Sequence, residues 1–156
     1  MLDGEVKKNS ARGNIASSQF RRNRVPQHIQ NQVVRLYCTE NNLQYVLSRA
    51  EYAISADNMC QIWAALHEGY PHIVAYSIMQ LPLDKKQRKE IIIYAINKDI
   101  KLHFACEKLI IEDYQSYEEI DCILRIQDAI DLYHDKESDL KELKRILDTT
   151  KFSNIC

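Results

Sequence analysis

Three clusters of polar residues each follow a short apolar run in this chain. The clusters span residues 24–31, 48–52 and 76–82. If the apolar runs form parallel strands, the three clusters meet at the carboxyl edge of one sheet, where open α/β folds bind their ligands. The sequence therefore predicts a binding site at that edge, although it does not identify a reaction.

The first cluster carries groups suited to an anionic or hydroxyl-rich ligand. It surrounds the predicted start of a helix, where free backbone N–H groups and the helix dipole favour an anion. Guanidinium groups bind carboxylates and phosphates, and amides both donate to and accept from sugar hydroxyls. We assign four of its side chains to substrate binding: Arg24, Gln27, Gln30 and Asn31. The alternative is that Gln27 and His28 are surface residues of the first helical turn and that the arginines are exposed to solvent.

Two residues are candidates for acid–base catalysis. Glu51 follows the second apolar run, and a carboxylate at a strand end can transfer protons. Its alternative role is an ion pair with Arg49 or another surface cation. Histidine is a common general acid or base, and His28 lies among the other candidates, although a histidine at a helix start can also be structural. His72 and His103 have no such neighbours in the sequence.

The remaining candidates would bind substrate through hydrogen bonds. Gln80 is assigned to binding rather than catalysis because an amide does not titrate. Hydroxyl and carboxylate groups at the same predicted edge complete the set: Ser48, Tyr52, Tyr76, Ser77 and Glu107.

No motif for a metal or a cofactor is present in the sequence. The histidines, cysteines and acidic residues lack HExxH or paired CxxC spacing, and GxGxxG and Walker-type loops are missing. We therefore expect no bound metal and no cofactor. The five cysteines are odd in number and widely spaced, which favours reduced thiols over a disulfide framework.

Composition and charge are those of an ordinary globular protein. The chain has 156 residues, of which 46% are hydrophobic and 28% are charged, enough for one sizeable core. A net charge of -1 gives no general attraction to phosphate backbones, which argues against a nucleic-acid partner. Because the chain has neither a signal-like N-terminal segment nor an apolar run of about 20 residues, we expect a cytoplasmic protein without a membrane partner.

Strand-like and helix-like segments alternate along the chain. Apolar runs predict strands at 13–17, 43–47, 72–77 and 100–106, with a short fifth at 109–111. Apolar residues at helical spacing predict helices between these strands. The alternation predicts an α/β fold with one doubly wound, mostly parallel sheet of four or five strands, helices on both faces, and right-handed crossovers.

Local signals predict where the helices begin. Pro26 suits the first turn of the first helix, and Ser55 is a candidate cap for the second. Capping boxes are expected at Asp84 with Gln87 for the third helix and at Ser116 with Glu119 for the fourth. Leucines at 140, 143 and 147 predict a final amphipathic helix. We expect a disordered leader at 1–10, an α/β domain at 11–134, and a C-terminal helix and tail at 135–156.

Several of these motifs occur together in one known family. They are Arg24-Val-Pro-Gln-His-Ile-Gln-Asn31, Ser48 with Glu51-Tyr52, Ala75-Tyr-Ser77, Gln80-Leu-Pro82, Arg88, and His103-Phe-Ala105 with Glu107. With them, residues 12–111 resemble the sporadic carbohydrate cluster protein family, small bacterial proteins named for genes that travel with surface-polysaccharide biosynthesis loci. The resemblance implies a cytoplasmic role in making or modifying a sugar for lipopolysaccharide, capsule or a related glycan. The chain departs from the family at Asn14, where a strand aromatic is more usual, and in its charged extension after about residue 135.

A weaker resemblance is to the catalytic domain of serine recombinases, also called resolvases. Ser17 or Ser18, followed by Gln27 and Gln30, occupies comparable places. That family has Asp-Arg-Leu after its third strand, where this chain has Ile78-Met-Gln-Leu81, and no helix-turn-helix domain follows. This resemblance therefore supports the fold and contributes little to function.

The favoured functional hypothesis is that the carboxyl edge binds an anionic sugar or sugar nucleotide and converts it by isomerisation, elimination or hydrolysis. The alternatives are a non-catalytic partner of a carbohydrate-biosynthesis enzyme and a catalytically inactive resolvase-like domain. A homo-oligomer is feasible, because the final amphipathic helix can bury its leucines against a second copy, and the alternative is that this helix packs on its own domain.

Overall fold

The fold is described from a computed structural model, which covers residues 8–17, 19–21, 24–52 and 59–135. The chain divides into two compact units, Met1–Cys122 and Ile123–Cys156. The first contains one sheet of five strands in the order β2-β1-β3-β4-β5. The strands are β1 (Ser10–Ala16), β2 (Gln44–Glu51), β3 (His72–Ala75), β4 (Lys101–Phe104) and β5 (Leu109–Ile111). All neighbours are parallel except β5, which runs antiparallel to β4, so the predicted α/β fold with a mostly parallel sheet is confirmed.

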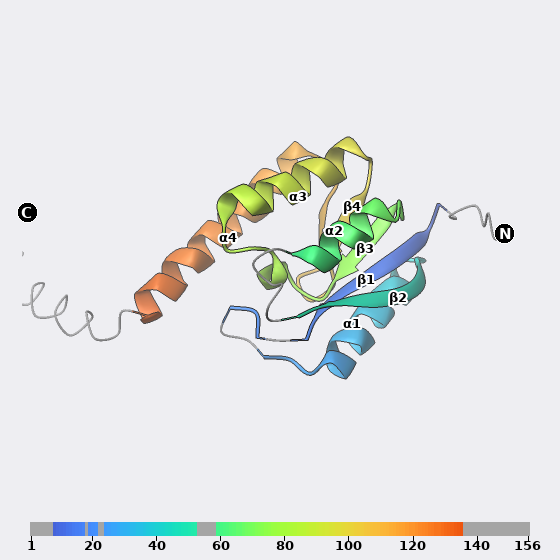
Figure 1. Cartoon of the computed structure of the whole chain (residues 1–156), viewed down its shortest axis with the longest axis horizontal. Coiled ribbons are helices and arrows are strands. Elements are labelled where there is room, and N and C mark those ends of the chain that lie inside the picture. Colours follow the sequence, from blue (N-terminus) through green and yellow to red (C-terminus); the bar gives the residue numbers. More distant parts are fainter. Residues whose placement is uncertain (1–7, 18, 22–23, 53–58, 136–156) are drawn as a thin grey trace, which may run out of the picture. The chain divides into compact units, whose positions relative to one another are not determined.

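Three helices, α1 (Gln27–Glu40), α2 (Cys60–His67) and α3 (Lys85–Asn97), cover the two faces of this sheet (Figure 1). A short 3-10 helix, η2 (Ile78–Gln80), follows β3, and the last described helix, α4 (Tyr114–Asp135), begins in the first unit and continues into the second. Figure 1 shows α1 on one face and α2 and α3 on the other. This placement follows from the strand order, because β1 has β2 on one side and β3 on the other and right-handed crossovers in opposite directions lie on opposite faces. The strand order reverses between β1 and β3.

The first two strands are longer than predicted, and their length decides where polar groups lie. β1 begins at Ser10 rather than Gly13, and it pairs with β2 on one side and β3 on the other. β2 was expected to end at Leu47 but continues to Glu51, because its pairing with β1 extends to the match of Ala16 with Glu51. Residues 48–51 of the second polar cluster therefore belong to a strand.

Two of the predicted helix starts differ from the observed ones. Pro26 is the N-cap of α1 rather than a residue of its first turn, and its carbonyl oxygen accepts from the backbone N–H of Ile29 at 3.0 Å. The capping box of α4 lies three residues before the predicted one. Asp113 Oδ1 accepts from the backbone N–H of Ser116 at 2.8 Å, and the Ser116 hydroxyl accepts from the backbone N–H of Asp113 at 3.1 Å. These reciprocal bonds start α4 at Tyr114.

The third helix begins at its predicted N-cap, Asp84, through one of the two bonds of the predicted capping box. Asp84 Oδ1 accepts from the backbone N–H of Gln87 at 2.8 Å, which caps α3 at its N-terminus. Ile91, Ile92 and Ala95 are fully buried, as their helical spacing predicted. The core on the other face of the sheet joins α1 to the strands through Ala11, Ile15, Val34, Tyr37, Cys38, Val74 and Ala105.

The described part of the second unit is the end of α4. Within it, Gln127 Nε2 donates to Asp131 Oδ1 one turn later, at 2.8 Å. Three predicted features lie outside the described residues: the leader as far as residue 7, the cap at Ser55, and the helix at Leu140–Leu147. Ser18, one of the two serines compared with the recombinase nucleophile, is also outside them.

Across the described ranges, no helix combines the length and apolar character needed to cross a membrane. The four cysteines in these ranges, Cys38, Cys60, Cys106 and Cys122, are all free thiols, and Cys38 alone among them is buried.

Candidate functional site

A cavity of about 480 Å³ lies at the carboxyl ends of β1, β2 and β3. Its walls come from the end of β1 and the segment after it, the last residue of β2, the N-cap of α2, and the stretch from η2 into α3. This is the point where the strand order reverses, which is the usual ligand position in doubly wound sheets. Its volume falls within the range of roughly 300–1,000 Å³ typical of small-molecule sites.

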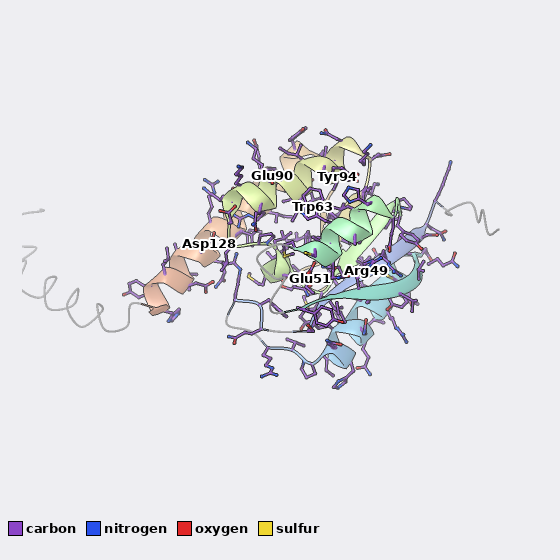
Figure 2. All side chains as sticks on the ribbon, in the orientation of Figure 1. Arg49, Glu51, Trp63, Glu90, Tyr94 and Asp128 are labelled. Atoms are coloured by element: carbon purple, nitrogen blue, oxygen red, sulfur yellow. The ribbon has the colours of Figure 1, made fainter. Side chains whose placement is uncertain are left out.

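Glu51 is the acidic group at the end of β2 that faces this cavity. Its side chain is 5% exposed, and Oε1 accepts from the backbone N–H of Ile62 in the first turn of α2 at 2.7 Å. Figure 2 shows Glu51 and Arg49 on the same strand, with Glu51 nearer its end. Arg49 Nε donates to Glu68 at 2.8 Å and Nη1 donates to Gln61 at 3.1 Å. A buried carboxylate fixed by a backbone N–H is positioned for acid–base chemistry.

A pair of buried glutamines forms the frame behind the cavity. Gln30 Nε2 donates to the carbonyl oxygens of Ala16 and Val25 at 2.8 and 2.7 Å. Gln30 Oε1 accepts from the backbone N–H of Ala16 at 2.9 Å and from Nε2 of Gln80 at 3.2 Å. These four bonds use all the donors and acceptors of the Gln30 amide, so Gln30 extends β1 and does not face a ligand.

Gln80 belongs both to this frame and to the cavity wall. Its Oε1 accepts from the backbone N–H groups of Tyr76 and Ser77 at 2.8 and 3.2 Å. Its Nε2 donates one hydrogen to Gln30, which leaves the second Nε2 hydrogen as the remaining donor of this amide. Since Gln80 lines the cavity, this N–H is a hydrogen-bond donor for a bound molecule.

Ser77, Glu107 and Tyr76 hold the segment after β3 in place. The Ser77 hydroxyl donates to Glu107 Oε1 at 2.6 Å, and Glu107 Oε2 accepts from the backbone N–H of Ile78 at 3.1 Å. These bonds fix the start of η2. A hydrogen bond to Cys106, together with burial, raises the pKa of Tyr76 to about 12, so this phenol stays protonated at neutral pH. Ser77, Glu107 and Tyr76 do not line the cavity.

The second polar cluster is split between the two faces of the sheet. Side chains alternate along a strand, so Ser48 and Glu51 point to opposite faces. Ser48 Oγ lies 2.9 Å from the hydroxyl of Tyr45, which donates to Asn31 Oδ1 at 3.4 Å on the α1 face. Ser48 and Asn31 are therefore brought together with each other and away from Glu51.

Four other predicted site residues are exposed and do not line the cavity. Tyr52 follows β2 and is 61% exposed. The other three, Arg24, Gln27 and His28, lie on the surface at the start of α1. Ser17, compared above with a recombinase nucleophile, donates its hydroxyl hydrogen to the backbone carbonyl oxygen of Glu51 at 2.6 Å.

Two residues that line or support the site were not assigned to it from the sequence. Asn14 lies in the middle of β1, is 1% exposed, and lines the cavity. Arg88 is fully buried in α3, where its Nη1 donates to the carbonyl oxygen of Pro82 at 2.9 Å and its Nη2 to Asp121 Oδ1 at 3.2 Å. Arg88 thereby ties the cavity wall at Pro82 to α3 and α4. A polar residue inside a predicted strand was the sequence signal that could have identified Asn14. Nothing in the sequence around Arg88 indicated that this side chain is buried.

A second, shallower groove of about 490 Å³ lies on the outer surface of α2 and α3. Trp63 and Tyr94 meet edge to face in it with ring centroids 5.4 Å apart, and Figure 2 shows their positions on these two helices. In the part of the chain that the structure describes, no three histidine, cysteine, aspartate or glutamate side chains are grouped to hold a metal ion. Comparison with known proteins finds no matching family model and no matching curated protein.

Proposed function

We propose that the cavity at the end of β1, β2 and β3 binds a sugar or sugar nucleotide, with Glu51 as the acid or base of any conversion. The observation that supports this most directly is that two buried polar residues, Glu51 and Gln80, line the same cavity at the reversal of the strand order. Buried carboxylates at such a position are typical of binding and catalytic sites.

The hydrogen-bonding groups of the cavity match hydroxyls. Glu51 offers carboxylate oxygens as acceptors and Gln80 offers one N–H donor, and a hydroxyl can satisfy both because it donates and accepts. Phe20 and Met59 supply apolar surface beside these polar groups. A sugar presents the same combination, with hydroxyls at its edge and an apolar ring face.

The charges of the lining are mixed. Arg21 is the single cationic side chain among the described residues that line the cavity, whereas Glu51 and Asp84 are acidic. A phosphate or carboxylate of the ligand would therefore be placed toward Arg21, and the hydroxyls toward Glu51. The resemblance to proteins encoded with surface-polysaccharide genes favours the same ligand class and a cytoplasmic role in glycan biosynthesis.

The test is a thermal-shift titration with UDP-glucose, glucose 1-phosphate and N-acetylneuraminic acid. A probe at a hundred times its Kd stabilises the folded protein by about 2.7 kcal/mol, which corresponds to roughly 5 to 10 °C for a chain of this size. We expect at least one probe to give such a shift, Glu51→Gln to reduce it, and Arg24→Ala at the start of α1 to leave it unchanged.

Two results would contradict the proposal. The absence of a shift with all three probes would favour the role of a protein partner without a small ligand. A shift lost in Arg24→Ala but kept in Glu51→Gln would move the site to the helix start at α1.

A further inference from the structure

Asn14 lines the cavity with a buried side chain whose amide oxygen is unpaired. The side chain is 1% exposed, and its Oδ1 atom has no hydrogen-bond partner in the structure. Buried polar groups are almost always paired, because an unpaired one has lost its bond to water without replacement. An unpaired acceptor that lines a cavity of ligand size therefore indicates a group reserved for a bound molecule.

The position of Asn14 in the sheet directs it to the same face as Glu51. In the parallel register Asn14 pairs with Arg49 on β2 and with Ala75 on β3, and Ala16 pairs with Glu51. Residues two apart on a strand share a face, so Asn14, Ala16 and Glu51 all contribute to one wall of the cavity. The Asn14 amide and the Glu51 carboxylate are thus diagonal neighbours across two paired strands.

Gln30 is a buried amide with a purely structural role, and it can be compared with Asn14. It is as deeply buried as Asn14, yet all of its donors and acceptors are used, in bonds to Ala16, Val25 and Gln80. Asn14 could have been an apolar residue at no cost to the backbone pairing of β1, because its side-chain oxygen bonds nothing in the protein.

We infer that Asn14 Oδ1 accepts a hydrogen bond from a hydroxyl or acylamino N–H of the sugar, and that it selects ligands which carry such a donor at this point. This assignment rests on the proposed sugar-binding function. A neutral amide oxygen accepts from a neutral donor without the added charge of a carboxylate. Together with the acceptor at Glu51 and the donor at Gln80, Asn14 Oδ1 defines a set of contacts to the hydroxyls of the sugar. A sugar that lacks one of these hydroxyls would leave the corresponding protein group unpaired.

The first part of the test needs no ligand. Asn14→Leu replaces the unpaired amide with an apolar side chain of similar branching, and it should raise the melting temperature of the ligand-free protein by about 2 to 4 °C. Gln30→Leu is the matched control and should lower the melting temperature, because it leaves the backbone groups of Ala16 unpaired. A lower melting temperature for Asn14→Leu, as well as for the smaller Asn14→Ala, would show that the amide supports the fold and would overturn the assignment.

The second part uses UDP-glucose and its 2-, 3- and 4-deoxyfluoro analogues, in which fluorine keeps the size of the hydroxyl but cannot donate. In the wild type, one analogue should bind about tenfold or more weakly than UDP-glucose, and in Asn14→Ala this difference should disappear. Binding of UDP-glucose with the same analogue preference in both proteins would keep the proposed function and overturn the role of Asn14. A wild type that binds none of the sugar probes would overturn the proposed function, whereas the melting temperatures would still show whether Asn14 is unpaired.

Discussion

Acidification should destabilise the protein through a series of hydrogen-bonded side chains on the α1 face of the sheet, of which Tyr37 and His103 are buried. Tyr37 Oη lies 2.9 Å from His103 Nδ1, and His103 Nε2 lies 2.9 Å from His72 Nδ1. The last hydrogen bond of the series joins His72 Nε2 to the carbonyl oxygen of Lys8, at 3.1 Å. Because a carbonyl oxygen can only accept, both histidines must donate from Nε2 and accept at Nδ1, with Tyr37 as the first donor. Each group is satisfied when both histidines are neutral.

Burial keeps the two histidines neutral. It lowers the pKa of His103 from 6.5 to about 4, with a further contribution from the neighbouring His72 and Lys101. Burial also lowers the pKa of His72, again assisted by the charge of Lys101. A proton added at His72 Nδ1 would in addition face the N–H of His103, so the chain of hydrogen bonds would break.

The pKa of His103 determines the sign and size of the effect. The unfolded chain takes up a proton near pH 6.5, whereas the folded protein does so only near pH 4. The unfolded state therefore binds more protons between these values, and stability is complete above pH 6.5 and is lost as the pH falls. The separation corresponds to about 3 kcal/mol of unfolding free energy in total, of which about 2 kcal/mol is lost by pH 5.

Urea unfolding at pH 7.5 and pH 5 measures this loss. We expect the wild type to lose about 2 kcal/mol more than His103→Gln, which keeps a donor and an acceptor but does not titrate. His28→Gln, at an exposed histidine of α1, is the matched control for removal of an imidazole. Equal losses in the wild type and His103→Gln would refute the reasoning. So would nitrogen NMR shifts showing a proton on His103 Nδ1 at neutral pH.

Three further changes have defined outcomes. Gly13→Ala should lower the unfolding free energy by about 1–3 kcal/mol, because an added Cβ would lie 3.1 Å from Ser48 Cα and against the Ser48 hydroxyl. Adding Ser48→Ala to this variant should recover part of the loss. A urea titration that finds Gly13→Ala as stable as the wild type would contradict this. Arg88→Met should lower the unfolding free energy, measured in the same way, by roughly 3 kcal/mol, because it removes the buried guanidinium that bonds Asp121 and Pro82. An unchanged midpoint of urea unfolding would show that the ion pair is dispensable. Burial raises the pKa of Cys38 to about 11. Mass spectrometry after brief alkylation should therefore find the exposed Cys60 modified and Cys38 intact. Early labelling of Cys38 would argue against its burial.

The parts of the fold that the sequence predicted are those set by neighbouring residues. The capping of α3 by Asp84 and its buried isoleucines depend on contacts within one or two helical turns. The alternation of strands and helices likewise follows from local apolar patterns, and right-handed crossovers then restrict the sheet to few arrangements. The cavity at the carboxyl edge follows from that topology, so Glu51 and Gln80 could be assigned to it before their contacts were known.

The parts that sequence reasoning missed depend on pairing between distant segments. The end of β2 was placed four residues early, and only the register with β1 shows that Ser48 and Glu51 lie on a strand and face opposite sides. His72 and His103 are 31 residues apart and seemed isolated, yet β3 and β4 place them side by side. Gln30 was assigned to substrate binding, but its amide is buried and bonds the backbone N–H and carbonyl oxygen of Ala16 at the end of β1.

The buried amides separate the frame of the site from its binding groups. The bonds among Gln30, Gln80 and Ala16 form without a ligand, so the wall they make is ordered before a ligand binds. A site that is already ordered loses little conformational entropy when a ligand enters, and more of the contact energy then contributes to affinity. Asn14 lies within this ordered wall, and its side-chain oxygen is unpaired. Its burial therefore lowers the stability of the free protein, and the loss is recovered only when a bound ligand donates a hydrogen bond to this oxygen. The same arrangement therefore explains why an interior strand position carries an amide and why the cavity should discriminate between ligands that differ by one hydroxyl.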